Sequence, residues 1–282
     1  QGCEHGCIYC YARPTHEYLG WSAGLDFESR ILVKERAPEL LRRALSSPRW
    51  RPRVVAIGAV TDPYQPIEGR LRLTRRCLEV FVEFRNPVGV VTKSGLVLRD
   101  LDLLGELARF DAATVTVSIT SLDPDLARIL EPRAATPERR LACVRGLAEA
   151  GIPVGVLVAP VIPALNDHEI PSLVEAAAEA GAQSVGHVML RLPHGVAGLF
   201  EAWLDRYLPE RKQKILNRIR SMRGGRLNDS RFHTRHLGGG FFAEQTHRLF
   251  EIAQRRAGLD GQRFTPSTAA FRRPAPPQLS LF

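Results

Sequence analysis

The feature that most constrains the fold is a repeated alternation of short, almost continuously apolar runs with stretches of helical period. The apolar runs occupy 54–60, 88–92, 114–120, 153–159 and 184–190. Unbroken apolar runs of this length are typical of strands in a parallel sheet that is covered on both faces. Strand–helix alternation then implies right-handed crossovers between parallel neighbours. We therefore predict an α/β fold.

The stretches between these runs carry helix signals. In 71–84 and 99–110, apolar side chains recur about once per helical turn. Thr136 followed by Pro137 predicts a helix start, because a threonine cap and a first-turn proline favour that position, and Gly151 predicts its end. The other predicted helices are a short one after Asp123, then 167–180, 199–221 and 241–257.

Five strand–helix units suggest most of a barrel. We predict a partial (β/α)6 TIM-like barrel over 1–195, whose first strand would precede Gln1. A helical extension is expected over 196–260. The segment 261–282 contains four prolines and is expected to be an extended, mobile tail.

Composition limits the class of protein. The formal net charge of +9 suits a polyanionic partner such as DNA or RNA. However, only four of the 39 basic residues are lysines, and such a bias towards arginine also arises from a GC-rich genome. No run of eighteen apolar residues and no signal peptide is visible, so we expect a cytoplasmic protein with no membrane partner.

Three cysteines crowd into the motif Cys-x-x-x-Cys-x-x-Cys. Cys3, Cys7 and Cys10 offer thiolates, which suit iron–sulfur clusters, and their close spacing allows one loop to wrap a cluster. Three thiolates leave one iron of a [4Fe–4S] cluster open to a chelating molecule such as S-adenosylmethionine (SAM). The alternative is a zinc knot that adds His5 or His16.

The cysteine motif followed by strand–helix units resembles the radical SAM superfamily over roughly residues 1–190. This resemblance implies an enzyme that holds a [4Fe–4S] cluster on the three cysteines. It also implies that SAM is cleaved reductively to a 5′-deoxyadenosyl radical. Tyr9 matches the aromatic position before the third cysteine, which implies that it lines the adenine pocket.

A closer resemblance is to spore photoproduct lyase and its relatives, in which a SAM radical reverses a thymine lesion in DNA. It implies that Thr61, Lys93 and Ser118 contact SAM, with Lys93 pairing with the carboxylate, and that Tyr11 relays a hydrogen atom. The stretches that carry the resemblance are Cys7-Ile-Tyr-Cys-Tyr11, Thr61-Asp62, Val91-Thr-Lys93, Ser118-Ile119, Glu131-Pro132 and Val156-Leu-Val-Ala-Pro160.

One position departs from the lyase pattern. The lyase has a cysteine that donates a hydrogen atom just before its Thr/Ser-Asp pair, and here Ala59 occupies that place. Cys77 falls on the apolar face of a predicted helix, which favours a place in the core over a catalytic role. The identity of the hydrogen-atom donor is therefore open. For the same reason, it is also open whether this chain catalyses the lyase reaction.

The chain ends in a short apolar peptide behind a proline-rich stretch. Gln278, Leu279, Ser280, Leu281 and Phe282 resemble the peptide by which bacterial replication and repair proteins dock on the DNA sliding clamp. An extended segment of this kind can place apolar side chains in pockets of a partner. The alternative is a tail that packs on its own domain.

Together these features favour a radical SAM enzyme that acts on nucleic acid, with a reaction like that of a DNA-repair lyase. Its partners would be DNA, the sliding clamp and an electron donor for the cluster. Two alternatives remain: a radical SAM enzyme that modifies RNA, a peptide or a small molecule, and a non-catalytic iron–sulfur or zinc protein that binds nucleic acid.

Overall fold

The computed structural model describes residues 1–231, 234–261 and 264–274. In this part of the chain, five parallel strands form one sheet in sequential order. The α/β prediction is confirmed, and each predicted strand is present. The strands are β1 (Val55–Ile57), β2 (Val88–Thr92), β3 (Ala113–Ser118), β4 (Val154–Val161) and β5 (Ser184–Met189).

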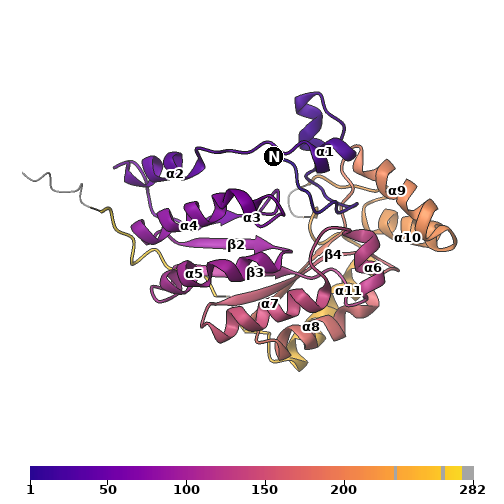
Figure 1. The fold of residues 1–282 in the computed structure, drawn as a ribbon. Helices are drawn as coiled ribbons and strands as arrows, with labels where there is room; N and C mark the ends of the chain where they lie inside the picture. Colours follow the sequence, from indigo (N-terminus) through magenta and orange to yellow (C-terminus); the bar gives the residue numbers. More distant parts are fainter. Residues whose placement is uncertain (232–233, 262–263, 275–282) are drawn as a thin grey trace, which may run out of the picture.

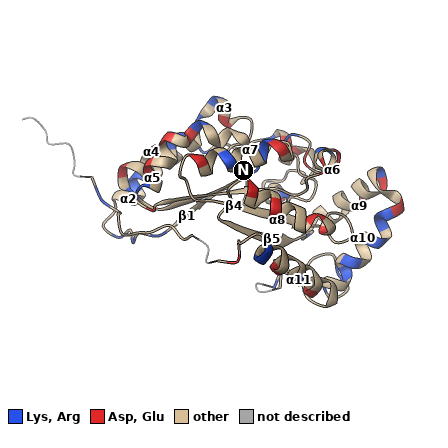
Figure 2. Cartoon of the chain, turned by 90° about the horizontal axis from the view of Figure 1, so that it is seen from below, with Lys and Arg blue, Asp and Glu red and all other residues tan. Residues whose placement is uncertain are grey.

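Helices connect the strands, and Figure 2 shows α4, α5 and α7 together on one side of the sheet. Thr136 caps α7 as expected, because its hydroxyl accepts a hydrogen bond from the Arg139 amide. The crossover helices are α3 (Glu68–Leu71), α4 (Leu73–Phe84), α5 (Leu101–Ala108), α6 (Pro124–Leu130), α7 (Pro137–Glu149) and α8 (Ile170–Glu179). Two 3-10 turns, Gly95–Asp100 and Asp167–Glu169, precede α5 and α8.

The first strand is shorter than its apolar run suggested. It ends at Ile57 because Gly58 adopts a φ of +91°, which is left-handed and incompatible with an extended strand. A Cβ atom at Gly58 would lie 2.1 Å from the Val91 carbonyl oxygen on β2. The glycine therefore lets the chain turn out of the sheet close to its neighbour, and residues 58–62 become a loop.

The region after β5 contains α9 (Val196–Tyr207), α10 (Pro209–Met222) and α11 (Phe241–Arg256). The single helix predicted over 199–221 is wrong in one respect, because it is interrupted at Leu208. Pro209 has no amide hydrogen and disfavours helical geometry in the residue before it, and Leu208 has φ −144° and ψ 48°.

These helices contribute to two hydrophobic cores. Phe250 and Ala253 of α11 join the large core of the sheet, and α11 packs beside α8. In contrast, α9 and α10 pack with Tyr9 and Leu130 in a smaller core under the cysteine loop. Figure 1 shows α9 and α10 at one end of the molecule, beyond β4 and α6. None of the described helices is long and apolar enough to cross a bilayer.

The chain before β1 forms a 3-10 helix (Arg13–Leu19), α1 (Leu25–Ser29) and α2 (Ala37–Ser46). At the other end of the chain, residues 264–274 contact loops that precede β1, β2 and β3. Ser267, Arg272 and Arg273 donate hydrogen bonds to the carbonyl oxygens of Asp111, Phe84, Glu83, Ser47 and Trp50. The start of the segment expected to be mobile is therefore bonded to the amino-terminal edge of the sheet.

Candidate active site

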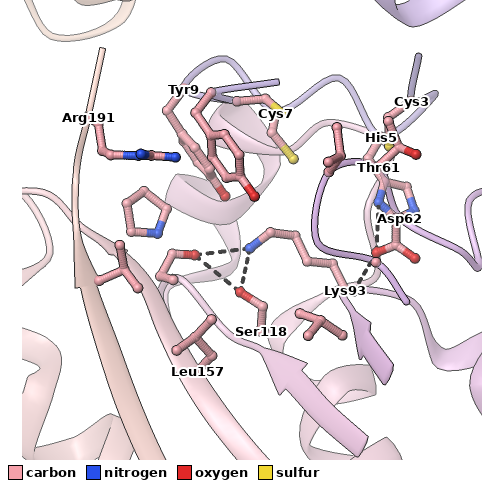
Figure 3. Close-up of a pocket in the computed structure, with 18 of the residues that line it drawn as sticks. Cys3, His5, Cys7, Tyr9, Thr61, Asp62, Lys93, Ser118, Leu157 and Arg191 are labelled. Carbon is pink, nitrogen blue, oxygen red and sulfur yellow. Dashed lines mark hydrogen bonds and ion pairs between the residues drawn. The ribbon is translucent and has the colours of Figure 1, made fainter. Parts of the chain in front are cut away.

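A cavity of about 240 Å³ opens at the carboxyl ends of the strands, where side chains from every strand connection converge. It brings together the predicted metal ligands, the predicted SAM contacts and both tyrosines of the motif. Figure 3 shows Cys7, Tyr9 and Arg191 on one side of Lys93 and Ser118, with Thr61 and Asp62 nearby. The lining residues from the sequence predictions are Cys3, Cys7, Tyr9, Cys10, Tyr11, Thr61, Lys93 and Ser118.

The cysteine loop is fixed by backbone hydrogen bonds to distant segments. The Cys3 amide donates to the Phe27 carbonyl over 2.9 Å, and the Ile8 amide donates to the Leu130 carbonyl over 3.0 Å. All three thiols are free of disulfides. The loop is thus anchored at one end by α1 and in its middle by the end of α6.

Arg13 supports this loop from inside. Its side chain is 1% exposed and forms an ion pair of 2.5 Å with Glu28. The guanidinium also donates to the carbonyl oxygens of Cys7 at 3.0 Å and Gly6 at 3.2 Å, and to those of Ala23 and Gly24. These bonds satisfy carbonyl groups that the tight loop cannot pair with its own amides. Nothing in the sequence distinguished Arg13 from other arginines.

The donor set fits a [4Fe–4S] cluster. Burial raises the pKa of Cys3 to about 12, and it also raises the pKa values of Cys7 and Cys10. The thiols therefore stay protonated unless a cation binds them, and their loading with iron would release protons. In such a cluster each cysteine binds a different iron. Three thiols that line one cavity can therefore supply the ligands of three of the four irons.

The zinc knot is not supported. Among the described residues, no three His, Cys, Asp or Glu side chains lie close enough together to hold a single metal ion. His16 is engaged elsewhere, because its ring bonds the Arg30 carbonyl at 3.0 Å and packs on Phe27. His5 instead lies 3.5 Å from the carboxylate of Asp62.

Lys93 projects into the cavity from the end of β2. Its ammonium donates to Ser118 Oγ at 2.8 Å (Figure 3). It also donates to Thr120 Oγ1 at 3.1 Å and to the Ala159 carbonyl at 3.1 Å. It also lies 3.0 Å from the Glu131 carboxylate. Lys93 is therefore a fixed cation at the cavity wall, with Ser118 beside it.

Glu131 is the centre of a buried polar network. Its side chain has no exposed surface and accepts hydrogen bonds from Tyr9, Thr120 and Arg140, besides pairing with Lys93. Burial alone would raise the pKa of Glu131. The charges of Arg140 and Lys93, together with the hydrogen bonds, outweigh this and hold its pKa well below the usual range. Glu131 thus joins the cysteine loop to β2, β3 and α7.

The two tyrosines of the motif occupy different environments. Tyr9 is buried, and its hydroxyl contacts both Glu131 and Thr120. Tyr11 is 45% exposed at the rim of the cavity, and its hydroxyl donates to the Ala59 carbonyl. Tyr11 therefore reaches the backbone of Ala59, on the loop after β1.

Asp62 shapes the loop that carries Thr61. It accepts hydrogen bonds from the Lys93 amide at 2.6 Å, the Thr92 hydroxyl at 2.7 Å and the Tyr64 amide at 2.8 Å. Since these bonds use both carboxylate oxygens, Asp62 acts here as a loop anchor that fixes the loop after β1 against β2.

Sequence reasoning missed three residues of the site: Arg140 and Arg191 altogether, and Glu131 except as part of a matching stretch. Only the Glu131-Pro132 pair offered a signal. The remaining cysteines, Cys77 and Cys143, lie on helices packed against the main core, and burial raises their pKa values to about 11 and about 12. They therefore behave as core residues.

Comparison with known proteins places this site in context. Residues 1–177 match the Radical SAM superfamily. An uncharacterized protein of Mycobacterium tuberculosis is 40% identical over 212 residues, covering 74% of this chain and 62% of that protein. An uncharacterized protein of Methanocaldococcus jannaschii is 32% identical over 168 residues, covering 60% of each. The chain thus spans less than two thirds of the length of these relatives.

The fold resembles that of spore photoproduct lyase. A mutant of that enzyme superposes with a TM-score of 0.62 at 17% identity, covering 92% of this chain and 73% of the lyase chain. The lyase complexed with dinucleoside spore photoproduct gives a TM-score of 0.60 at 18% identity, with the same coverage. A double mutant of the lyase with bound AdoMet gives a TM-score of 0.52 at 19% identity, covering 91% of this chain and 71% of the lyase chain.

Proposed function

Because this chain belongs to the radical SAM superfamily, we propose that it binds a [4Fe–4S] cluster on Cys3, Cys7 and Cys10 and cleaves SAM reductively. The observation that carries this proposal is the single cavity lined by the three cysteines, Lys93 and Ser118. When bound, the cluster would supply the electron that breaks a carbon–sulfur bond of SAM. The protein residues would bind SAM, orient it and exclude water.

The polar wall of the cavity suits SAM. Lys93 offers a cation for the carboxylate, and Ser118 offers a hydroxyl 2.8 Å from that cation. Thr61, on the loop after β1, offers a second hydroxyl, and Tyr9 an aromatic face for the adenine. Glu131 acts as a positioning residue, because it fixes Tyr9 and Lys93 through one buried carboxylate.

We propose nucleic acid as the substrate class, with a reaction like that of a DNA-repair lyase. The support is charge: α10 carries Arg211, Lys212, Lys214, Arg218 and Arg220 against one acidic residue. Figure 2 shows this basic helix at the outer surface near α9. Its end adjoins the cavity, because Arg223 donates to the carbonyls of Met189 and Leu190 in the cavity wall. Phosphate binding by such residues is the general basis of nucleic-acid affinity.

Tyr11 is proposed as the catalytic hydrogen relay. Ala59 has no transferable hydrogen, so a donor other than a thiol is needed at that place. Tyr11 fits because its hydroxyl reaches the Ala59 carbonyl and its side chain lines the cavity. A phenol can give up its hydrogen atom to a substrate radical; this leaves a phenoxyl radical, which takes one electron from the reductant and one proton from solvent before the next turnover.

The first prediction tests the cluster. Cys7→Ala is expected to bind less iron after anaerobic reconstitution and to form no 5′-deoxyadenosine from SAM and a strong reductant, since one iron loses its thiolate. Iron content, visible absorbance and product are measured together. Cys77→Ala is the matched control, because Cys77 lies on α4 outside the cavity, and it should retain both properties. Equal product from Cys7→Ala would disprove the assignment.

A second prediction separates SAM cleavage from hydrogen relay. Tyr11→Phe keeps the ring and removes only the hydroxyl, so 5′-deoxyadenosine should still form while turnover of a damaged-DNA substrate falls by at least about tenfold. Tyr18→Phe, at a side chain that is 87% exposed, should leave both rates unchanged. Normal substrate turnover by Tyr11→Phe would remove Tyr11 from the mechanism.

Two partner assignments remain predictions. The clamp-like peptide, Gln278 to Phe282, lies outside the described residues. A clamp-docking role is supported by the contacts of residues 264–274, which lie at the strand edge opposite the cavity and would leave its mouth free. An electron donor for the cluster is required by the proposed chemistry, and we place the protein in the cytoplasm.

A further inference from the structure

Arg191 lies at the mouth of the cavity, two residues after the end of β5. Its guanidinium carbon is 4.4 Å from the centroid of the Tyr11 ring, a stacking distance. Figure 3 shows the side chain extending across the cavity towards the cysteine loop, level with Tyr9. Within the described ranges, Arg191 forms no hydrogen bond and no ion pair, in contrast to Lys93.

This side of the cavity is electropositive. Arg223 donates to the carbonyls of Met189 and Leu190 and is 4% exposed, and Arg235 donates to the ring of His236, which also lines the cavity. Burial lowers the pKa of Arg191 from its usual value; Tyr11 opposes this shift, and the Arg235 charge adds to it. Among the described lining residues, Asp62 is the only acid, and it is bonded to the β2 edge. No lining carboxylate therefore neutralises Arg191.

A partly buried guanidinium without an acceptor is an unusual arrangement. Each N–H group that loses water without gaining a partner costs free energy, and the cost is larger for charged groups. The guanidinium carbon lies over the Tyr11 ring, and no described residue accepts a hydrogen bond from the guanidinium N–H groups. That edge matches the spacing of two oxygens on a phosphate or a carboxylate, so the site is prepared for an anion.

We propose that Arg191 binds a backbone phosphate of a nucleic-acid strand and so places the adjoining nucleotide beside Tyr11. This inference rests on the proposed function and names how that site holds its substrate. The carboxylate of SAM has the same chemistry, but the cavity already offers it Lys93 and Ser118. Phosphate is favoured because Arg191 sits over the more exposed tyrosine and next to Arg223, which follows the basic helix α10.

The experiment compares holoenzyme variants in which one arginine is changed. Arg191→Gln removes both the positive charge and the planar set of guanidinium N–H donors, whereas Arg191→Lys keeps the charge and removes only the guanidinium. Arg206→Gln is the matched control, because Arg206 also stacks on a tyrosine, Tyr207, but is exposed on α9. Fluorescence anisotropy measures binding of a short oligothymidylate at several salt concentrations, and equilibrium dialysis measures binding of SAM.

We expect Arg191→Gln to weaken oligonucleotide binding by about tenfold. The slope of log affinity against log salt should become shallower by about 0.7, the value for one phosphate contact on a single strand. Arg191→Lys should recover part of the affinity, and SAM affinity should stay within about twofold. Arg206→Gln should bind the oligonucleotide within about twofold of wild type.

Three results would overturn the inference. If Arg191→Gln binds the oligonucleotide with the same affinity as Arg206→Gln, Arg191 does not bind the phosphate, and the proposal of nucleic acid as the substrate class stands without this contact. If Arg191→Gln instead weakens SAM binding tenfold, the anion is the SAM carboxylate. If wild-type holoenzyme cleaves SAM but does not bind the oligonucleotide, the nucleic-acid proposal fails and this inference fails with it.

Discussion

Glu131→Gln is expected to lower the free energy of unfolding by about 3–5 kcal/mol, the usual cost of removing one partner from a buried ion pair. Glutamine keeps the shape but leaves Arg140 and Lys93 without their counter-charge, and both charges would then be buried uncompensated. The same change frees Lys93 and Tyr9 to move, so SAM binding should weaken as well. Denaturant unfolding and SAM dialysis measure the two effects.

Glu106→Gln is the control, because Glu106 is an exposed acid on α5, and it should change stability by less than about 0.5 kcal/mol. Acid provides a second test. Folding lowers the pKa of Glu131. The ionised carboxylate therefore contributes its whole stabilisation of the folded state above the usual pKa of 4.5, and this contribution is lost as the pH falls below 4.5. The difference in the free energy of unfolding between wild type and Glu131→Gln should therefore become smaller below about pH 4.5. A loss under about 1 kcal/mol at pH 7 would contradict the network.

Arg13→Met should also cost about 3–5 kcal/mol, and it should reduce the iron that the protein retains. Methionine fills much of the same volume but cannot bond the carbonyls of Gly6 and Cys7, and it leaves Glu28 with Arg133 as its remaining ion-pair partner among the described residues. The cysteine loop would lose its internal support while keeping its three thiols. Unfolding free energy and iron content after anaerobic reconstitution are the measurements.

Arg30→Gln separates this effect from a simple loss of charge. Arg30 lies on the neighbouring segment, is 55% exposed and pairs with Asp26, so its removal should cost less than about 1 kcal/mol. Iron content should be unchanged in this control. If Arg13→Met assembled a full cluster with wild-type stability, the loop would not depend on the buried guanidinium.

Features that depend on short stretches of sequence could be predicted. The five strands follow from apolar runs, because burial of both sheet faces leaves a local mark on each run. The cap at Thr136 and the end of α7 follow from capping chemistry within a few residues. The cysteine motif predicts its chemistry for the same reason, since three ligands within eight residues belong to one loop. Pro209 also indicates the break at Leu208, which the predicted helix over 199–221 did not include.

The wall of the cavity depends on contacts that sequence does not display. Glu131 meets Tyr9 across 122 positions of the chain, and Lys93 meets Ala159 across 66. Arg140 resembles its neighbour Arg139 in sequence, yet only Arg140 points into the interior. A charged side chain can be buried only where folding supplies its partner, so its role depends on the tertiary structure.

The sequence by itself therefore determined the class of fold, the cluster motif and the strand ends at which a site would form. The tertiary structure decided which polar side chains share that site and which of them are already neutralised. It paired Lys93 with Glu131 and gave Arg191 no acceptor among the described residues. The physical reason is that periodicity and capping act over a few residues, whereas the balance of buried charge is set by every segment that reaches the cavity.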